Sequence, residues 1–357
     1  MPTSMDSYRT LGRSGLRISP LTLGAMLFED TRRGCDRDTA FEIMSRFVDT
    51  GGNMIDTANS YAEGRSEETV GAFLATRPGL RDRLVISTKF GNSLFPGDPN
   101  GGGAGRKALM RQLDGSLRRL GTDYVDLYWL HGYDQHTPLE ETVAALDDVV
   151  RAGKVRYVGF SDVPAWAIGR AATIAELRGW APVVALQPEY SLLARTAESE
   201  MLGVARELRL GVTPWSPLAG GVLSGRYTRD GGAPEGSGRT AAPTVRTLLS
   251  ERTFQVLDAL GEIAKRQDTD VAAVALAWVL QQPLITSPIV GTRTVAHLEG
   301  ALRALPVTFT DEELITLAEL TTPTFAFPYP YLGGVAQLQQ AGATVNGVTS
   351  TPFTHTS

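Results

Sequence analysis

Four polar side chains follow three successive apolar stretches of the sequence, at spacings that could bring them together. Asp56 ends the first stretch and Tyr61 follows five residues later, while Lys89 and His131 come directly after the second and third stretches. An ammonium beside a phenol favours the phenolate and so lowers the pKa of the phenol, and a carboxylate beside the ammonium keeps it charged. A histidine can hydrogen-bond a substrate carbonyl oxygen. Together the four residues predict protonation of an oxygen as a hydride arrives at its carbon.

Each of these residues alone has an ordinary structural explanation. An aspartate at a strand end often caps the next helix, and a lone lysine is usually a surface cation. A lone histidine usually makes a structural hydrogen bond, and a loop tyrosine usually packs. The placement of all four after consecutive strands favours the catalytic interpretation, because the C-terminal ends of barrel strands meet at one mouth.

The apolar stretches predict eight buried β-strands that alternate with helices. They lack polar alternation, which is typical of parallel strands covered on both faces, and no G-x-G-x-x-G opens the first helix. Eight such units favour an α/β fold of the (β/α)8 type, a TIM barrel, over an open doubly wound sheet. Two glycine-rich loops, Gly91–Gly105 and Pro217–Pro243, would lie on its C-terminal face. The expected strands are Leu21–Met26, Asn53–Ile55, Leu84–Thr88, Val125–Leu130, Val155–Phe160, Val183–Gln187, Val212–Trp215 and Ile285–Val290.

We expect a single barrel domain over residues 1–357, with an N-terminal hairpin in residues 1–20 that closes one mouth. An additional C-terminal helix is expected over Asp311–Leu320. Residues 322–357 form a Thr-, Pro- and Gly-rich tail that we expect to be partly flexible. Within the tail, the aromatic segment Phe325–Tyr331 is expected to cover the substrate pocket.

Several segments resemble those of one enzyme family. The stretches N-M-I-D-T-A-N-S-Y, S-T-K-F and Y-W-L-H, with later motifs in the same order, resemble the aldo-keto reductases from about Tyr8 to Leu320. The resemblance implies a (β/α)8 barrel that reduces aldehydes or ketones with NADPH and without a metal. It also implies a catalytic tetrad of Asp56, Tyr61, Lys89 and His131. In that tetrad the tyrosine is the general acid, the lysine and aspartate tune it, and the histidine orients the carbonyl.

The resemblance further implies a site for NADPH or NADP+, with NADH as the alternative. The motifs G-F-S-D and L-Q-P-E-Y would hold the carboxamide, Trp215 would stack on the nicotinamide, and the loop after it would cover the pyrophosphate. Thr292 and Arg293 would bind the 2′-phosphate, since arginine offers a bidentate fork and a helix N-terminus favours anions. The implied cofactor residues are Gly24, Ala25, Met26, Asp56, Ser161, Asp162, Gln187, Trp215, Ser216, Pro217, Leu218, Gly220, Leu223, Gly291, Thr292, Arg293, His297 and Ala301.

Three departures from the family pattern bear on the cofactor. Asp162 stands where the family has asparagine, and an ionised aspartate cannot donate a hydrogen bond. His297 replaces the usual arginine or glutamine, and Gly300-Ala301 replaces the usual Glu-Asn pair against adenine. These changes would weaken the grip on adenosine, so NADPH is favoured and NADH stays open.

The substrate pocket is expected to have aromatic walls. We predict that Phe28, Phe90, Trp129 and Tyr133 line it beside Tyr61. Such walls favour apolar or flat carbonyl compounds, although sugars also stack on aromatic rings.

Composition excludes several other function classes. The 357 residues carry 34 basic and 39 acidic side chains, a net charge of −5, so no bulk attraction to nucleic acid or anionic membrane is expected. Cys35 is the only cysteine, which excludes an intrachain disulfide, and the four histidines show no close ligand pair for a metal. No stretch is apolar enough for a transmembrane helix or signal peptide, so we expect a cytoplasmic protein, either a monomer or a homo-oligomer.

Two other functions stay open at this stage. One is an NAD(P)-dependent sugar or alcohol dehydrogenase that works in the oxidative direction. The departures from the family pattern at Asp162 and Gly300-Ala301 suggest this alternative. The other is a nucleotide-binding regulatory β-subunit of a channel, which the intact tetrad does not exclude. Cofactor preference and pH optimum separate the first from a reductase, and capture of a membrane partner would indicate the second.

Overall fold

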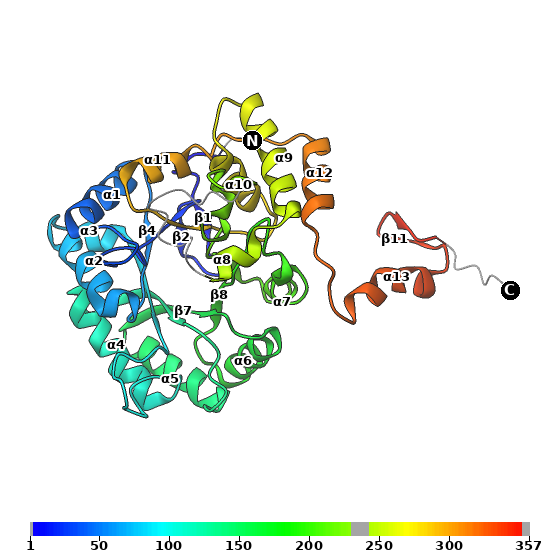
Figure 1. Cartoon of the computed structure of the whole chain (residues 1–357). Helices are drawn as coiled ribbons and strands as arrows, with labels where there is room; N and C mark the ends of the chain where they lie inside the picture. Colours follow the sequence, from blue (N-terminus) through cyan, green and yellow to red (C-terminus); the bar gives the residue numbers. More distant parts are fainter. Residues whose placement is uncertain (1–2, 230–242, 352–357) are drawn as a thin grey trace. The chain divides into compact units, whose positions relative to one another are not determined.

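The computed structural model describes residues 3–229 and 243–351 and has two compact units, Met1–Thr321 and Thr322–Ser357. The first unit contains one curled sheet of eight parallel strands in the order β10-β3-β4-β5-β6-β7-β8-β9, with helices around it (Figure 1). The strands are β3 (Thr22–Gly24), β4 (Met54–Asp56), β5 (Val85–Phe90), β6 (Val125–Leu130), β7 (Val155–Ser161), β8 (Val183–Gln187), β9 (Gly211–Val212) and β10 (Ile289–Gly291).

Contacts at the seam bring the two edge strands together. The N–H of Ile289 donates to the carbonyl of Pro214 at 2.9 Å, and Val212 forms a parallel bridge with Ile285. The prediction of a (β/α)8 barrel is thereby confirmed. The strand boundaries differ from the expected ones where chemistry matters, because β4, β5 and β7 continue through Asp56, Lys89 and Ser161.

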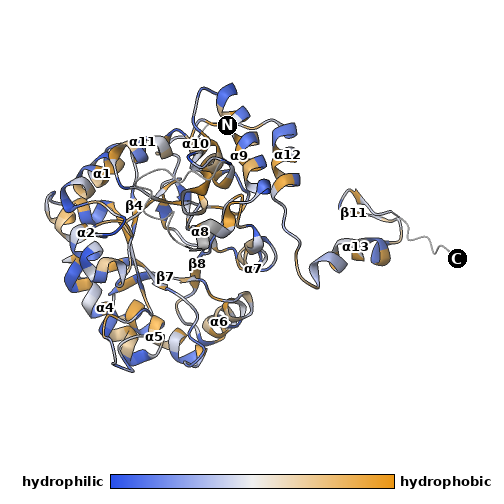
Figure 2. Ribbon diagram, viewed as in Figure 1, coloured by the Kyte–Doolittle hydropathy of each residue, from blue (hydrophilic) through white to orange (hydrophobic). Residues whose placement is uncertain are grey.

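Helices cover the outside of the sheet because one side of each is apolar. In α4, for example, Leu109, Leu113 and Leu117 are buried at helical spacing while Arg111 and Arg118 face outward, and Figure 2 shows the two-sided colouring of such helices. The helices of this unit are α1 (Arg37–Asp49), α2 (Arg65–Ala75), α3 (Leu80–Arg83), α4 (Arg106–Leu120), α5 (Leu139–Arg151), α6 (Ala165–Arg178), α7 (Met201–Leu208), α8 (Pro243–Leu248), α9 (Glu251–Arg266), α10 (Val271–Leu280), α11 (Val295–Leu302) and α12 (Asp311–Thr321).

The expected N-terminal hairpin is present as β1 (Arg9–Thr10) paired with β2 (Arg17–Ile18). Its side chains pack into the floor of the barrel in a separate apolar cluster of Leu11, Ile18, Met54, Val85, Leu127, Trp129, Val184 and Ala185. The Trp129 indole fills this floor so closely that a Cβ added at Gly159 would lie 2.3 Å from its Cζ3 atom. Glycine at position 159 is therefore required by the tryptophan.

This contact gives a stability prediction. Gly159→Ala is expected to destabilise the fold by about 1–3 kcal/mol, the usual cost of overpacking a core, as measured by urea unfolding. Gly169→Ala is the matched control, because Gly169 lies inside α6 with no atom within 4 Å of the added methyl group. The control is expected to be neutral or slightly stabilising, since alanine favours helix. Equal stabilities for the two variants would contradict this account of the floor.

The second unit holds α13 (Tyr329–Gln340) and a hairpin of β11 (Thr344–Val345) and β12 (Val348–Thr349). Phe327, Tyr331 and Val348 are exposed on it. That Phe325–Tyr331 covers the substrate pocket stays a prediction. None of the helices in the described residues has the length and apolarity needed to cross a membrane.

Candidate active site

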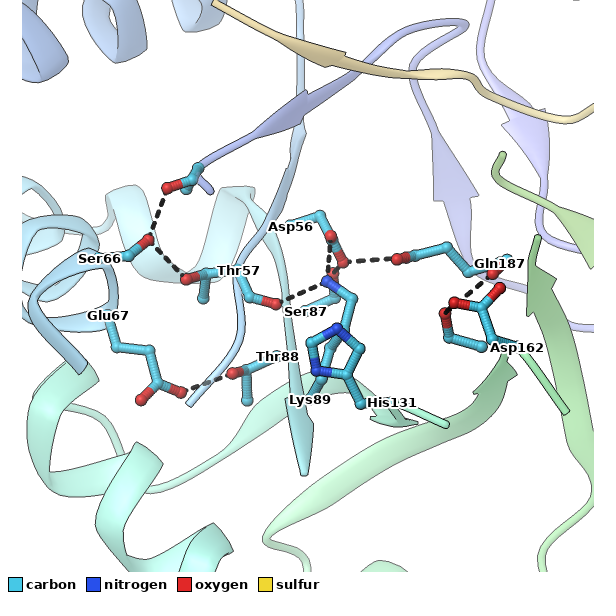
Figure 3. Close-up of polar contacts among 12 residues, drawn as sticks. Asp56, Thr57, Ser66, Glu67, Ser87, Thr88, Lys89, His131, Asp162 and Gln187 are labelled. Carbon is cyan, nitrogen blue, oxygen red and sulfur yellow. Dashed lines mark hydrogen bonds and ion pairs between the residues drawn. The ribbon is translucent and has the colours of Figure 1, made fainter. Parts of the chain in front are cut away.

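The four residues singled out by their spacing come together at the C-terminal ends of the strands. The Lys89 ammonium donates to Asp56 Oδ2 at 2.5 Å and to the Thr57 carbonyl at 2.9 Å (Figure 3). The ammonium also lies 4.8 Å from the centre of the Tyr61 ring. Asp56 ends β4 and Lys89 lies in β5, while Tyr61 opens the 3-10 turn η1 (Tyr61–Gly64). His131 directly follows β6, and its ring meets that of Tyr61 edge to face at 5.7 Å.

The Lys89–Asp56 pair is fully desolvated, so its geometry is held by neighbours as well as by charge. Lys89 is 0% and Asp56 2% exposed. Asp56 Oδ1 also accepts from the Ser87 hydroxyl at 2.5 Å and from Gln187 Nε2 at 3.2 Å. Buried ion pairs are favourable only where such additional hydrogen bonds satisfy the remaining lone pairs. The ammonium is thus held charged and in a fixed position.

Electrostatics around Tyr61 differ from the simple expectation. Burial raises the pKa of the Tyr61 phenol, and the nearby Lys89 ammonium, which lowers it, does not compensate fully. The sequence-based expectation of a lowered pKa is therefore wrong, because desolvation of the phenol outweighs the charge of Lys89. For Lys89, burial lowers the pKa, but Asp56 and Tyr61 outweigh burial and the net pKa is raised.

His131 is a neutral side chain in this site. Burial, followed by the charge of Lys89, lowers the pKa of its imidazole to about 3. A neutral ring can donate one hydrogen bond but is not an acid at physiological pH. The arrangement therefore has one proton donor, Tyr61, and one neutral hydrogen-bonding partner, His131.

A cavity of about 600 Å³ extends from the tetrad to the start of α11. It gathers most of the residues implied by the family resemblance, from seven separate strand ends and the segments that follow them. Those in its wall are Gly24, Met26, Asp56, Tyr61, His131, Ser161, Asp162, Gln187, Trp215, Ser216, Pro217, Leu218, Gly220, Gly291, Thr292, Arg293, His297 and Ala301. Ala25 and Leu223 are instead fully buried in the core, and Lys89 lies behind the wall.

Three of the four residues expected in the substrate pocket lie elsewhere. Phe28, Phe90 and Trp129 are all 0% exposed and belong to apolar core clusters. Side chains alternate along a strand, so with Lys89 directed into the barrel, Phe90 faces outward, where it stacks on Tyr128 at 4.7 Å. Trp129 does point inward, but it occupies the barrel floor. We therefore correct that expectation for these three residues.

The fourth expected pocket residue, Tyr133, does not line the cavity either, and it is exposed just after the end of β6. Its N–H donates to the Asp162 carbonyl at 3.3 Å, and its ring packs edge to face on Trp166 at 5.6 Å. Trp166 is 57% exposed, which is unusual for so large an apolar side chain. Sequence reasoning missed Trp166, although it stands only four residues after Asp162.

Asp162 takes a role that the sequence did not suggest. Its backbone has φ of +48°, and its Oδ1 accepts from the Trp215 indole N–H at 3.1 Å. Burial raises the pKa of this carboxyl, and the hydrogen bond from Trp215 opposes the effect. Ser161 beside it donates to the Gln187 carbonyl at 2.9 Å. The aspartate thus fixes the ring plane of Trp215 in the cavity wall.

The far end of the cavity suits an anion. Arg226, Arg293 and His297 line it, and Thr292 Oγ1 is a buried hydroxyl for which the described residues provide no hydrogen-bond partner. The pKa of His297 is lowered by burial and by the two arginines. Sequence reasoning missed Arg226, although it stands only three residues after Leu223, which was expected to contact the cofactor. It also missed Arg33, Tyr227, Asp270 and Arg303 in the same wall.

The loop between the two ends has a backbone suited to phosphate. Ser216, Ala219, Gly220 and Gly221 all have positive φ, from +49° to +97°. Successive residues in such conformations turn N–H groups to one side and form anion-binding concavities. Across the described residues, no cluster of three or more His, Cys, Asp or Glu side chains could hold a metal ion.

Comparison with known proteins gives a consistent result. The model of the aldo/keto reductase family matches residues 20–321. An uncharacterized oxidoreductase, YrpG, of Bacillus subtilis (strain 168) is 39% identical over 321 residues, covering 87% of this chain and 94% of the relative. Aryl-alcohol dehydrogenase GME11368 of Pestalotiopsis microspora is 34% identical over 92% of this chain and 86% of its own. Norsolorinic acid reductase B of Aspergillus parasiticus is also 34% identical, over 92% of this chain and 88% of its own.

Proposed function

Because this chain belongs to the aldo/keto reductase family, and is thereby an oxidoreductase of carbonyl and alcohol groups, we propose that it reduces an aldehyde or ketone with NADPH. The observation that carries the proposal is the juxtaposition of Tyr61 with the buried Lys89–Asp56 pair and neutral His131 at one end of a 600 Å³ cavity. Tyr61 is the general acid.

In the proposed reduction, the carbonyl group receives one hydride and one proton, and each has a defined source. The nicotinamide, when bound, supplies the hydride for the carbonyl carbon. The Tyr61 hydroxyl gives its proton to the carbonyl oxygen, and the Lys89 ammonium stabilises the phenolate that remains. His131 donates a hydrogen bond to the same oxygen, and Asp56 keeps Lys89 charged and aimed. Burial raises the pKa of the free phenol, so the proton stays on Tyr61 until charge develops on the oxygen.

The cavity wall fits NADPH from one end to the other. Ser161, Asp162 and Gln187 would hold the carboxamide, and Trp215 would stack against the nicotinamide. Backbone N–H groups after Trp215 would hold the pyrophosphate. At the far end, the Thr292 hydroxyl, which finds no hydrogen-bond partner among the described residues, would receive the adenosine phosphate together with Arg226, Arg293 and His297.

The cofactor preference depends on the cationic end. Arg293→Ala is expected to weaken NADPH binding by about 10- to 150-fold, since a charge-assisted hydrogen bond contributes about 1.5–3 kcal/mol, and to leave NADH binding nearly unchanged. Quenching of tryptophan fluorescence during titration with each nucleotide measures both affinities. Equal losses for the two nucleotides would mean that Arg293 does not contact the 2′-phosphate. Tight NADH binding by the parent would favour the dehydrogenase alternative.

For the substrate we propose aromatic carbonyl compounds. Two of the relatives are named for aryl alcohols and for norsolorinic acid. Exposed Tyr133 and Trp166, which follow two of the strands that carry the site, offer apolar ring surface on the catalytic face. Aryl alcohols would be the substrates of the reverse reaction.

The proposal is tested by following reduced-nicotinamide absorbance with NADPH and NADH against aromatic aldehydes, simple ketones and sugar aldehydes. We expect the fastest consumption with NADPH and an aromatic aldehyde. Preferred oxidation of an aryl or sugar alcohol with NAD+ would instead support the dehydrogenase alternative. If the protein bound nucleotide but turned over none of these compounds, the reductase proposal would be wrong and the regulatory alternative would gain support.

A further inference from the structure

Asn92 contacts the catalytic histidine from the loop that follows β5. Its side-chain Nδ2 lies 3.2 Å from His131 Nδ1 and 3.3 Å from Ser60 Oγ. Neither the spacing of the tetrad nor the family resemblance singled out this residue. The contact is made at one of the two ring nitrogens of His131, Nδ1.

The backbone at Gly91 and Asn92 is held by two buried side chains. The Asn92 carbonyl accepts a hydrogen bond from Asn59 Nδ2 at 2.8 Å, and Asn59 Nδ2 also donates to Gln112 Oε1 at 2.8 Å. Gln112, from α4, in turn accepts from the N–H of Gly91 at 2.9 Å. Asn59 and Gln112 are 1% and 4% exposed. This buried network fixes the start of the loop relative to the segment that carries Tyr61.

The contact determines where the imidazole carries its proton. An amide nitrogen only donates hydrogen bonds, so His131 Nδ1 must accept, and a ring nitrogen that accepts carries no proton. In a neutral imidazole the proton is then on Nε2, because the hydrogen bond at one nitrogen sets the tautomer at the other. With Nδ1 occupied, Nε2 is the nitrogen left to act in the cavity that His131 lines.

We propose that Asn92 is a positioning residue that holds His131 in the Nε2-protonated tautomer, the form able to donate a hydrogen bond to a carbonyl oxygen. The effect on catalysis rests on the proposed function, whereas the tautomer itself does not. In the opposite tautomer Nε2 would present a lone pair to the oxygen and repel it.

The tautomer can be measured directly by 15N NMR. The chain has only four histidines, His131, His136, His297 and His355, so the imidazole spectrum is short, and loss of one set of signals in His131→Gln assigns it. We expect the parent to show a neutral His131 ring protonated at Nε2. Asn92→Asp replaces the donor by a group that only accepts, so Nδ1 should become protonated. Asn100→Asp makes the same charge change at an exposed position of the same loop and should leave the signals unchanged.

Steady-state kinetics then test the effect of the tautomer on catalysis, at a pH where the spectra show a neutral His131 ring. We expect Asn92→Asp to lower kcat by about 10²-fold, similar to the loss of one oxyanion donor, with NADPH affinity unchanged. Asn92→Ala, which imposes neither tautomer, should fall between this variant and the parent. An Nδ1-protonated ring in the parent, or an unaltered tautomer in Asn92→Asp, would overturn the inference. A parent without any carbonyl turnover would instead contradict the proposed function and leave the tautomer result intact.

Discussion

Tyr61→Phe is expected to lower the kcat for carbonyl reduction by about 10²–10⁴-fold, the range that a positioned general acid contributes. The substitution removes only the hydroxyl that gives its proton to the carbonyl oxygen. The aromatic ring that meets His131 edge to face at 5.7 Å is retained, so NADPH affinity and the urea midpoint should stay close to those of the parent. Stopped-flow single turnovers separate the loss in chemistry from any change in binding.

Tyr124→Phe is the matched control for this substitution. Tyr124 lies just before β6, at the opposite end of the barrel, and its hydroxyl contacts Asp82 at 3.2 Å. We expect turnover in this control to equal that of the parent. If Tyr61→Phe turned over substrate as fast as the control, another group would have to be the acid.

Lys89→Met is expected to lower kcat through loss of the cation beside Tyr61, and also to destabilise the fold. The methionine has similar length but no charge, so the Tyr61 phenolate loses the cation that stabilises it. Asp56 also loses the partner that donates to it at 2.5 Å in a fully buried site. Breaking a buried pair by removal of one partner costs about 3–5 kcal/mol, and kcat should fall by at least about 10²-fold.

Two measurements keep these effects apart. Urea unfolding reports the stability, and kcat at a temperature well below the unfolding transition reports the chemistry. Lys265→Met is the control, because Lys265 is 75% exposed and pairs with exposed Glu262, a contact that contributes little. A Lys89→Met protein with parental stability and turnover would show that the lysine is not coupled to Asp56 or Tyr61.

Three of the four tetrad residues could be brought together from the sequence because they end or follow strands, whereas Tyr61 lies in the turn η1 and was placed only by its short spacing from Asp56. Asp56, Lys89 and His131 end or follow adjacent parallel strands. Asp56 pairs with Ser87 and Lys89 with Trp129, so each of the later two stands two positions beyond the partner of the one before, as expected for the tilted strands of a barrel. The family resemblance implied the residues of the cofactor site, one motif at a time. Most of those residues indeed line the cavity, although which nucleotide they bind is still a proposal.

The substrate residues could not be predicted because burial is a tertiary property. An aromatic residue next to a catalytic one, such as Phe90 beside Lys89, faces the opposite side of the strand and packs in the core. The pKa of Tyr61 was misjudged for a related reason, since the sequence shows the neighbouring charge but not the desolvation. Asn92 lies in a loop and Trp166 in the first turn of α6, and strand periodicity determines the direction of neither side chain.

The central claim, that a hydride passes from NADPH to a carbonyl carbon while Tyr61 protonates the oxygen, is tested most directly by isotope transfer. The parent and Tyr61→Phe would each be incubated with an aromatic aldehyde and NADPH that carries deuterium at the transferable position of the nicotinamide, and the alcohol analysed by mass spectrometry. We predict one deuterium at the carbinol carbon with the parent, and almost no deuterated alcohol with Tyr61→Phe. An alcohol without deuterium, or equal yields from the two proteins, would contradict the account.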